Sequence, residues 1–375
     1  MGRLAEISGL PMRHALRFQA ISRPEIAKYL DERIRESATP KEIDLEETAL
    51  KLLGFVPSDF SLRKAMIDLL SEQAAAFYDY HRRALFLANW TPVSLRDEAV
   101  VHELAHALAD QSIHLEKFIK KVDRDSEKSL AREAVVEGQA SYLMLAYAAK
   151  QQGQPPLGVR PAPDQFDRAL ETTGGEFPVF DAAPLYMRAS LVFPYTWGMA
   201  FQTAVVERLG KSAFLEVLRN PPVSTRQIIH PECYFDGEQP TKPGLPRRPR
   251  DAKVLLDGTL GELDHEILLR QYGSANLARE LGSKWRGGRF RIAENKRGGG
   301  RMLLYASEWA DNSAAGSFFQ SYKLCLAGKW GKIQAREDSA ARFSGFAKAG
   351  YFVVEKAGRI VRSEEGLPSP DWATF

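Results

Sequence analysis

The chain has 375 residues, of which 44% are hydrophobic and 26% charged, and its formal net charge is +3. A chain of this size and apolar content can bury a sizeable core and is long enough for two domains. Its basic and acidic residues are interspersed and no apolar run reaches membrane-spanning length, so the composition indicates neither a nucleic-acid partner nor a membrane span.

The first third of the chain alternates helical and strand patterns. Apolar residues at helical spacing predict helices within 23–36 and 61–73, and residues 75–90 predict two short strands around a polar turn. Between Arg96 and Lys121 the apolar residues again recur at helical spacing, with acidic residues in the first turn. We therefore expect one helix over that range.

The next segment is expected to supply two more helices. The pattern predicts a helix over residues 129–152, followed by a Pro/Gly-rich passage from Gly153 to about Pro184 that should be mostly loop. A further helix over 194–210 is predicted to open on Pro194, because proline suits the first position of a helix.

Residues 240–250, "PTKPGLPRRPR", are rich in proline and arginine and predict an exposed connector. Beyond it, the patterns predict a helix in 261–282, two strands in 289–309, a helix in 314–328 and a hairpin in 350–363. The expected fold class is therefore α+β. A mainly helical domain with a small sheet should cover residues 1–245, and a smaller α+β domain should cover 251–375.

The segment "DEAVVHELAHALADQ" carries the most specific chemical signal. His102 and His106 are four residues apart, so a helix places both rings on one face, where they can converge on one ion. Catalytic Zn²⁺ takes three protein ligands and leaves a position for water. Glu103 stands where HExxH sites carry the base that takes a proton from that water.

A third ligand is expected from the helix that contains "AREAVVEGQAS". Glu133 and Glu137 share one face of that helix. The apolar surroundings of Glu137 would not suit a bare carboxylate, so Glu137 is the predicted ligand. Glu133 is expected to be exposed to solvent or to contact the ligands without binding the metal itself. The plain alternative is that these groups are ordinary helix histidines and solvated acids.

The stretch "HELAHALAD" resembles the HExxH helix of the gluzincin metallopeptidases, the thermolysin-like branch of the zincins, including an acid at Asp110. "AREAVVEGQAS" stands where that branch carries its glutamate ligand. Most of the chain also resembles a group of bacterial zincin-like proteins, through "HELAHALADQ", "VEGQA" and "PPVSTRQIIHPE". The resemblance implies a zincin-like fold for residues 1–245, bound zinc and peptide-bond hydrolysis.

The chain departs from the gluzincin pattern in two places. Ser141 stands where that branch has an aspartate that holds a histidine ring, and residues 112–129 lengthen the interval between the histidines and the glutamate. The metzincin motif is excluded, because Ala109 and Ser112 stand where it needs glycine and histidine.

The resemblance also implies a donor for the oxyanion that forms on the attacked carbonyl, and the candidates are Tyr195 and His230. We expect a zinc-dependent metallopeptidase acting on a peptide or protein, with the strand at residues 84–88 as an edge for an extended substrate. Two alternatives stay open: a zinc-binding protein without proteolytic activity, and a zinc hydrolase of a non-peptide substrate. The oligomeric state is not predicted.

The compartment depends on whether a leader has been removed. The first 30 residues lack the apolar segment of a signal peptide, so we expect a secreted or periplasmic protein if a leader was trimmed and a cytoplasmic one otherwise. Cys233 and Cys325 could form one bridge or stay free.

Overall fold

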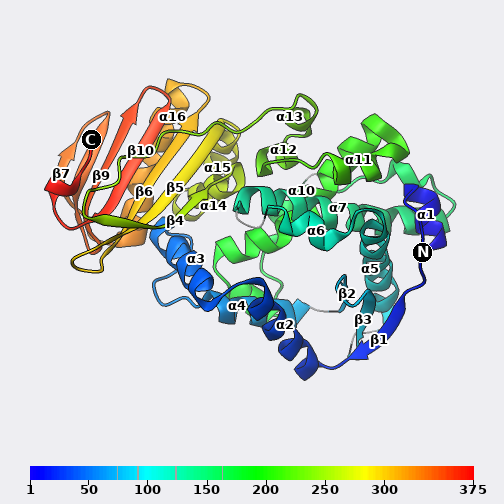
Figure 1. The fold of residues 1–375 in the computed structure, drawn as a ribbon. Helices are drawn as coiled ribbons and strands as arrows, with labels where there is room; N and C mark the ends of the chain where they lie inside the picture. The colour runs from blue at the N-terminus through cyan, green and yellow to red at the C-terminus, as the bar shows by residue number, and fades with distance from the viewer. Residues whose placement is uncertain (74, 91–92, 123–124, 163) are drawn as a thin grey trace. The chain divides into compact units, whose positions relative to one another are not determined.

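The computed structural model describes residues 1–375 apart from 74, 91–92, 123–124 and 163. It confirms the predicted α+β class, with a small three-stranded sheet and a larger seven-stranded one (Figure 1). The chain forms two compact units. The first consists of Met1–Thr39, Leu62–Ala183 and Met187–Glu238, and the second of Pro40–Ser61, Pro184–Tyr186 and Gln239–Phe375.

This division differs from a single boundary between residues 245 and 251, because the second unit also takes an early segment and the whole proline-rich connector. The connector is not simply exposed. Pro243, Pro246 and Pro249 are buried, and the Thr241 N–H donates to the carbonyl of Arg286 at 2.8 Å. These contacts fasten it to the second unit.

The first unit is mainly helical. Its elements are α1 (Gly2–Ser8), β1 (Arg17–Ile21), α2 (Arg23–Ser37), α4 (Leu62–Gln73), β2 (Ala76–Asp79), β3 (Ala84–Ala88), α5 (Val93–Ile113), α6 (Leu115–Lys120), α7 (Ser126–Gln151), η1 (Pro156–Gly158), α8 (Gln165–Ala169), α9 (Pro178–Ala182), α10 (Leu185–Leu209, apart from its first two residues), η2 (Gly210–Ser212), α11 (Ala213–Arg219), α12 (Thr225–Ile229) and α13 (Pro231–Phe235). As predicted, the passage from Gly153 to Pro184 is mostly loop, interrupted by short helical turns.

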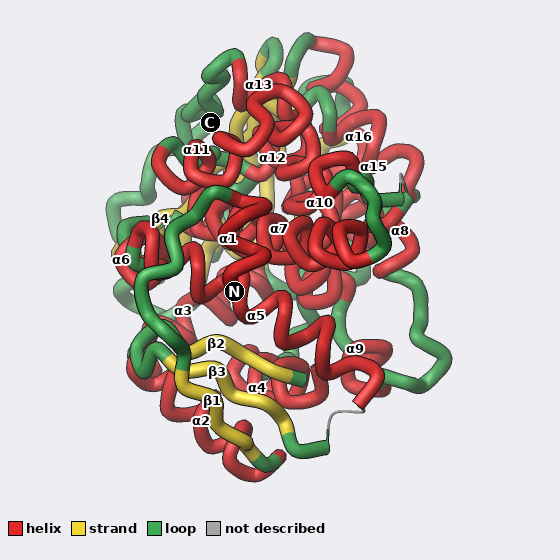
Figure 2. The backbone as a smooth tube through the Cα atoms, turned by 90° about the vertical axis from the view of Figure 1, so that its right-hand side faces the viewer, coloured by secondary structure: helices red, strands yellow, loops and turns green. Residues whose placement is uncertain are grey.

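The small sheet has the order β1-β3-β2 (Figure 2). β1 runs parallel to β3 with Arg17 opposite Ala84, and β2 runs antiparallel to β3 with Tyr78 opposite Leu85. The strand at 84–88 is therefore central, and the expectation that it offers an edge was wrong. The sequence pattern did not reveal β1, four of whose five residues are exposed, and β1 covers that edge.

The single helix expected between Arg96 and Lys121 is broken at His114, whose φ of 58° lies in the left-handed region. α5 ends at Ile113 and α6 begins at Leu115. The buried Asp110 carboxylate accepts the N–H of Leu115 at 2.8 Å and the hydroxyl of Tyr78 at 2.9 Å. Asp110 thus stabilises the break and ties α5 to β2.

The predicted start of α10 at Pro194 was also wrong, because the helix begins at Leu185 and carries Pro194 inside it. Proline removes one helical hydrogen bond. Burial of the flanking side chains Ala189 and Phe193 offsets that loss, and the Thr196 hydroxyl donates to the carbonyl of Val192 at 2.8 Å.

The second unit is built on one antiparallel sheet of order β4-β5-β6-β10-β9-β8-β7. Its elements are α3 (Pro40–Leu53), β4 (Ala252–Thr259), α14 (Glu262–Tyr272), α15 (Ala275–Gly282), β5 (Trp285–Asn295), β6 (Arg301–Trp309), α16 (Asn312–Trp330), β7 (Gln334–Asp338), β8 (Arg342–Ala347), β9 (Gly350–Ala357), β10 (Ile360–Leu367) and η3 (Pro370–Trp372). The predicted strands in 289–309 and the hairpin in 350–363 are confirmed.

Several elements of this unit were missed. The helix expected over 261–282 is two helices, separated where Ser274 caps the second one, and α3, β4, β7 and β8 were not predicted. β7 is exposed at every residue, so it lacks the apolar alternation that marks a strand.

Cys233 and Cys325 are both buried free thiols, and burial raises their pKa values to about 11 and about 12. Among the described residues, no helix combines the length and the apolar character that crossing a bilayer requires.

A buried ion pair joins α16 to the sheet of the second unit. The Lys329 ammonium lies 2.7 Å from the Glu365 carboxylate, and both side chains are almost fully buried. Glu365 also accepts from the hydroxyls of Tyr322 and Ser363 and from the indole of Trp330. Both charges are therefore removed from water, and each is stabilised by the other.

Replacing Lys329 with Met should leave that carboxylate buried without its counter-ion and lower the free energy of unfolding by about 3 kcal/mol. Chemical denaturation followed by tryptophan fluorescence measures the change. The control is Lys28→Met, which breaks an exposed pair with Glu32 at 3.9 Å and should cost about 0.5 kcal/mol or less. Equal effects of the two variants would contradict a structural role for the buried pair.

Candidate metal centre

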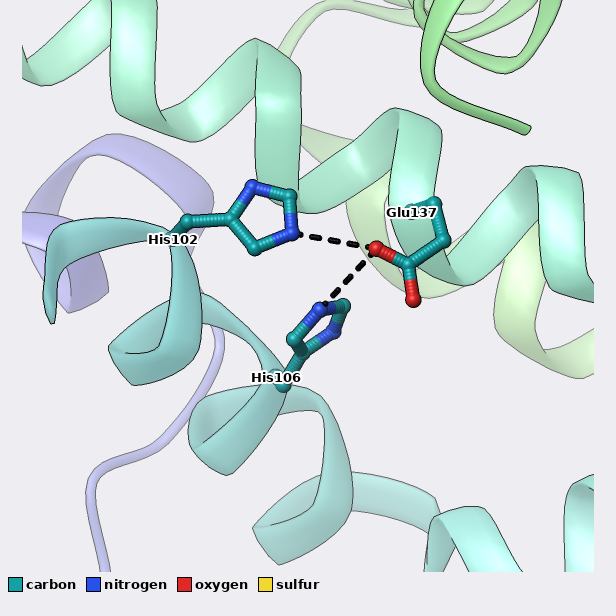
Figure 3. A group of neighbouring side chains, drawn as sticks. All are labelled: His102, His106 and Glu137. Atoms are coloured by element: carbon teal, nitrogen blue, oxygen red, sulfur yellow. Dashed lines mark hydrogen bonds and ion pairs between the residues drawn. The ribbon is translucent and has the colours of Figure 1, made fainter. Parts of the chain in front are cut away.

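The two histidines and the glutamate expected to bind metal come together in the first unit. His102 and His106 project from one face of α5 toward Glu137 on α7 (Figure 3). Their Nε2 atoms lie 3.0 and 3.2 Å from the same Glu137 oxygen. The i, i+4 spacing of the histidines therefore produces the convergence predicted from the sequence.

The donor set fits a metal ion. Two ring nitrogens and one carboxylate oxygen lie within 4.8 Å of one another. Tetrahedral ligands at the usual zinc distances are separated by roughly 3.3 Å, close to the separations observed between the histidine nitrogens and Glu137. These three residues could hold a metal ion without rearrangement of α5 or α7.

In the metal-free protein, these groups stabilise one another's charges. Burial acts to raise the pKa of Glu137, but the positive charge of His106 and hydrogen bonds from both histidines outweigh it and hold the pKa well below its usual range. Burial likewise acts to lower the pKa of His106, but the Glu137 carboxylate raises it to about 9. Glu137 is therefore ionised and His106 protonated at neutral pH.

Glu103 lies beside the ligands without being one of the converging three. Its carboxylate accepts the backbone N–H of Tyr78 on β2 at 2.7 Å. Burial raises its pKa, and the charge of Glu137 adds to that rise, whereas the two histidines oppose it. A carboxylate held in place with a raised pKa has the properties of a general base.

The site opens into a recess of about 860 Å³. Its walls come from α2, α4, β2, α5, α6, α7, α8 and α10, and most of its lining side chains are apolar or aromatic. His102, Glu103, His106 and Glu137 all line it. The candidate ligands are thus accessible rather than enclosed in a shell of protein side chains.

The structure brings one of the two candidate oxyanion donors to this recess. Tyr195 on α10 lines it, and its ring stacks on that of His102 with centroids 5.8 Å apart. The charge of Glu137, followed by desolvation, raises the pKa of Tyr195 well above its usual value, so the phenol keeps its proton. His230 is not among the lining residues and instead pairs with Glu232 at 3.6 Å.

The neighbouring acids take different positions. Glu133 is exposed one turn before Glu137, yet desolvation by surrounding protein atoms and the charge of Glu137 raise its pKa to about 7. Ser141 is mostly buried and lines the recess one turn after Glu137. Asp110 supports the break between α5 and α6, as described above, rather than the metal group.

A close contact between α7 and α10 positions α7, the helix that carries Glu137. The sequence pattern did not reveal this contact. α7 and α10 approach so closely that a methyl group at Gly138 would overlap the Gly198 carbonyl, and one at Gly198 would overlap the Ala134 carbonyl. Gly138 follows Glu137, and Gly198 lies one turn after Tyr195. The glycine pair therefore sets the spacing between the third ligand and the tyrosine.

No protein-family model matches the chain, and searches of curated proteins and of solved structures likewise found no match.

We predict that Gly138→Ala pushes α7 away from α10 and lowers both the free energy of unfolding and the metal affinity, because Glu137 must move with the helix. Thermal unfolding and metal titration measure the two effects. Gly316 is the matched control, since it lies in α16 with open space around its Cα, and Gly316→Ala should be neutral or slightly stabilising. An unchanged metal affinity in a folded Gly138→Ala variant would refute the positioning role.

Proposed function

We propose that this protein is a zinc-dependent metallopeptidase of gluzincin type. The observation that carries the proposal is the group of His102, His106 and Glu137 around one point, with Glu103 beside it in an open recess. Three protein donors and an accessible further position are typical of catalytic zinc, whereas structural zinc is enclosed by four protein ligands. The sequence resemblance to the gluzincins supports the same assignment.

Bound zinc would lower the pKa of a coordinated water molecule and polarise the substrate carbonyl. His102, His106 and Glu137 would hold the ion through two neutral imidazole nitrogens and one carboxylate oxygen. Because His106 is protonated in the metal-free protein, it must release a proton when it becomes a ligand.

The roles of the remaining residues follow from their positions. Glu103 takes the proton from the attacking water and later delivers it to the leaving amine, and its bond to the Tyr78 N–H keeps the carboxylate oriented. Tyr195 retains its proton and is proposed to donate a hydrogen bond to the oxyanion that forms on the carbonyl. His230, away from the recess lining, is not assigned that role.

The shape of the recess favours an extended peptide as the substrate. β2 forms an outer strand of the small sheet and contributes Ala76, Phe77 and Tyr78 to the recess wall. The carbonyl of Ala75 accepts from Ala88 on β3, so by alternation the backbone groups of Ala76 and Tyr78 face away from β3. β2 therefore replaces β3 as the proposed edge for substrate pairing, through the backbone groups of Ala76 and the carbonyl of Tyr78, because the Tyr78 N–H already donates to Glu103.

Three conservative variants test the proposal. Glu103→Gln should keep its zinc. It should hydrolyse an unstructured protein at least about 100-fold more slowly than the parent protein, because the amide cannot take a proton. Glu137→Gln should lose zinc as well as activity. Glu133→Gln is the matched control on the same helix face and should retain most of its zinc.

Elemental analysis and a casein-cleavage assay measure these outcomes. The water-activation role would be abandoned if Glu103→Gln cleaved casein at the parent rate. The ligand assignment would be abandoned if Glu133→Gln lost zinc while Glu137→Gln kept it.

Zinc affinity should rise with pH. His106 has a pKa of about 9 in the metal-free protein, so below that pH zinc must displace a proton from it, whereas Glu137 is already ionised. The apparent affinity should therefore increase roughly tenfold per pH unit between about pH 6.5 and 8.5. Competition with a chelator of known pH dependence measures it, and an affinity that stays flat over this range would contradict the His106–Glu137 pairing.

A further inference from the structure

The recess extends well beyond the candidate metal ligands along α7. Glu137, Ser141 and Leu145 lie at i, i+4 and i+8 on one face of that helix, and all three line the recess. The rise of an α-helix places Leu145 about 12 Å from Glu137 along the helix axis. A strand covers that distance with about four residues, so there is room for several substrate residues on this side of the centre.

The recess also continues on the opposite side, where α6 forms its wall. Leu115 and Ile119 of α6 line the recess. The Arg132 guanidinium, on the amino-terminal side of Glu137 in α7, lies over the Phe118 ring at 4.6 Å and donates to the Phe118 carbonyl. Arg132 therefore anchors α6 beside the amino-terminal part of α7, and the candidate ligands lie between Ile119 and Leu145.

The side chains at these two ends are apolar and exposed. Ile119 is 36% exposed and Leu145 38% exposed, and both face the recess. Exposed apolar area that becomes buried against a ligand contributes about 25 cal/mol per Å² to binding. Both ends therefore favour an apolar side chain.

The ionisable lining side chains are mainly acidic. None of the described lining residues is Lys or Arg, whereas Glu98, Glu103 and Glu137 are carboxylates. Glu98 is exposed in the first part of α5, outside the metal group. Zinc would supply a cation at the centre, so this negative charge would act mainly on an acidic side chain bound away from the ion, where none of the described lining residues is Lys or Arg.

We infer that Ile119 and Leu145 are specificity-determining residues, which select apolar side chains on opposite sides of the reacting bond in an extended polypeptide segment. This inference rests on the proposed peptidase function. In this scheme α6 forms one wall of the substrate-binding recess. α6 lies in the segment that lengthens the interval between the histidines and Glu137.

The test measures peptide binding by the zinc-loaded Glu103→Gln protein, so that turnover is not required. Fluorescein-labelled ten-residue peptides would carry leucine four residues before and four residues after the central bond, or aspartate at one of these places. We expect the leucine peptide to bind roughly tenfold more tightly than either aspartate peptide, which corresponds to about 1.4 kcal/mol.

Charge substitutions show which side of the bound peptide each of the two residues contacts. Ile119→Lys and Leu145→Lys, each in the Glu103→Gln background, should weaken binding of the leucine peptide roughly tenfold and strengthen binding of one aspartate peptide, a different one for each variant. Leu209→Lys is the matched control, because Leu209 is also 38% exposed but is not a lining residue. If either lysine variant unfolds, Ile119→Gln or Leu145→Gln removes the apolar contact without adding charge.

The outcomes separate the inference from the proposed function. Equal affinities for all three peptides, or an unchanged leucine preference in the folded Ile119 and Leu145 variants, would overturn the inference even if the parent protein cleaves casein. If the binding preferences follow the expected pattern but the parent protein cleaves no peptide, the specificity of the recess is supported and the peptidase proposal fails.

Discussion

The position of the Glu137 carboxylate is the constraint on which the rest of the first unit depends. It is a charge in a largely apolar recess, and such a charge is costly unless it is paired. His102 and His106 supply that pairing from α5, so α5 and α7 must pack with their ligand faces toward each other. The contact between α7 and α10 at Gly138 and Gly198 then holds the third helix close enough for Tyr195 to reach the same group.

The sequence predicted the part of this arrangement that follows from helix periodicity. The convergence of the two histidines required only their spacing, and the choice of Glu137 over Glu133 followed from its apolar neighbours. The approach of α7 and α10 could not be predicted in this way, because single glycines within helices do not identify the helix that they contact. Tyr195 and His230 were likewise equal candidates until the fold placed one of them in the recess.

The errors in the predicted fold have a common physical origin. The break at His114 depends on Asp110, whose side chain replaces a backbone acceptor, and helical periodicity continues through that position. β1 and β7 carry few buried residues, so hydrogen bonding to a neighbouring strand defines them, and apolar alternation does not. The confirmed strands β5, β6 and β9, by contrast, each bury several apolar residues.

The interleaving of the two units along the chain has a consequence for biosynthesis. α3 is made early, yet it belongs to the unit whose sheet begins with β4 at Ala252 and ends with β10 at Leu367. Its buried residues Leu50 and Leu53 therefore lack their final surroundings until nearly the whole chain has left the ribosome. The last residue of the first unit is Glu238, so this unit can fold before the strands that pack with α3 have been synthesised. The order of folding therefore differs from the order of synthesis.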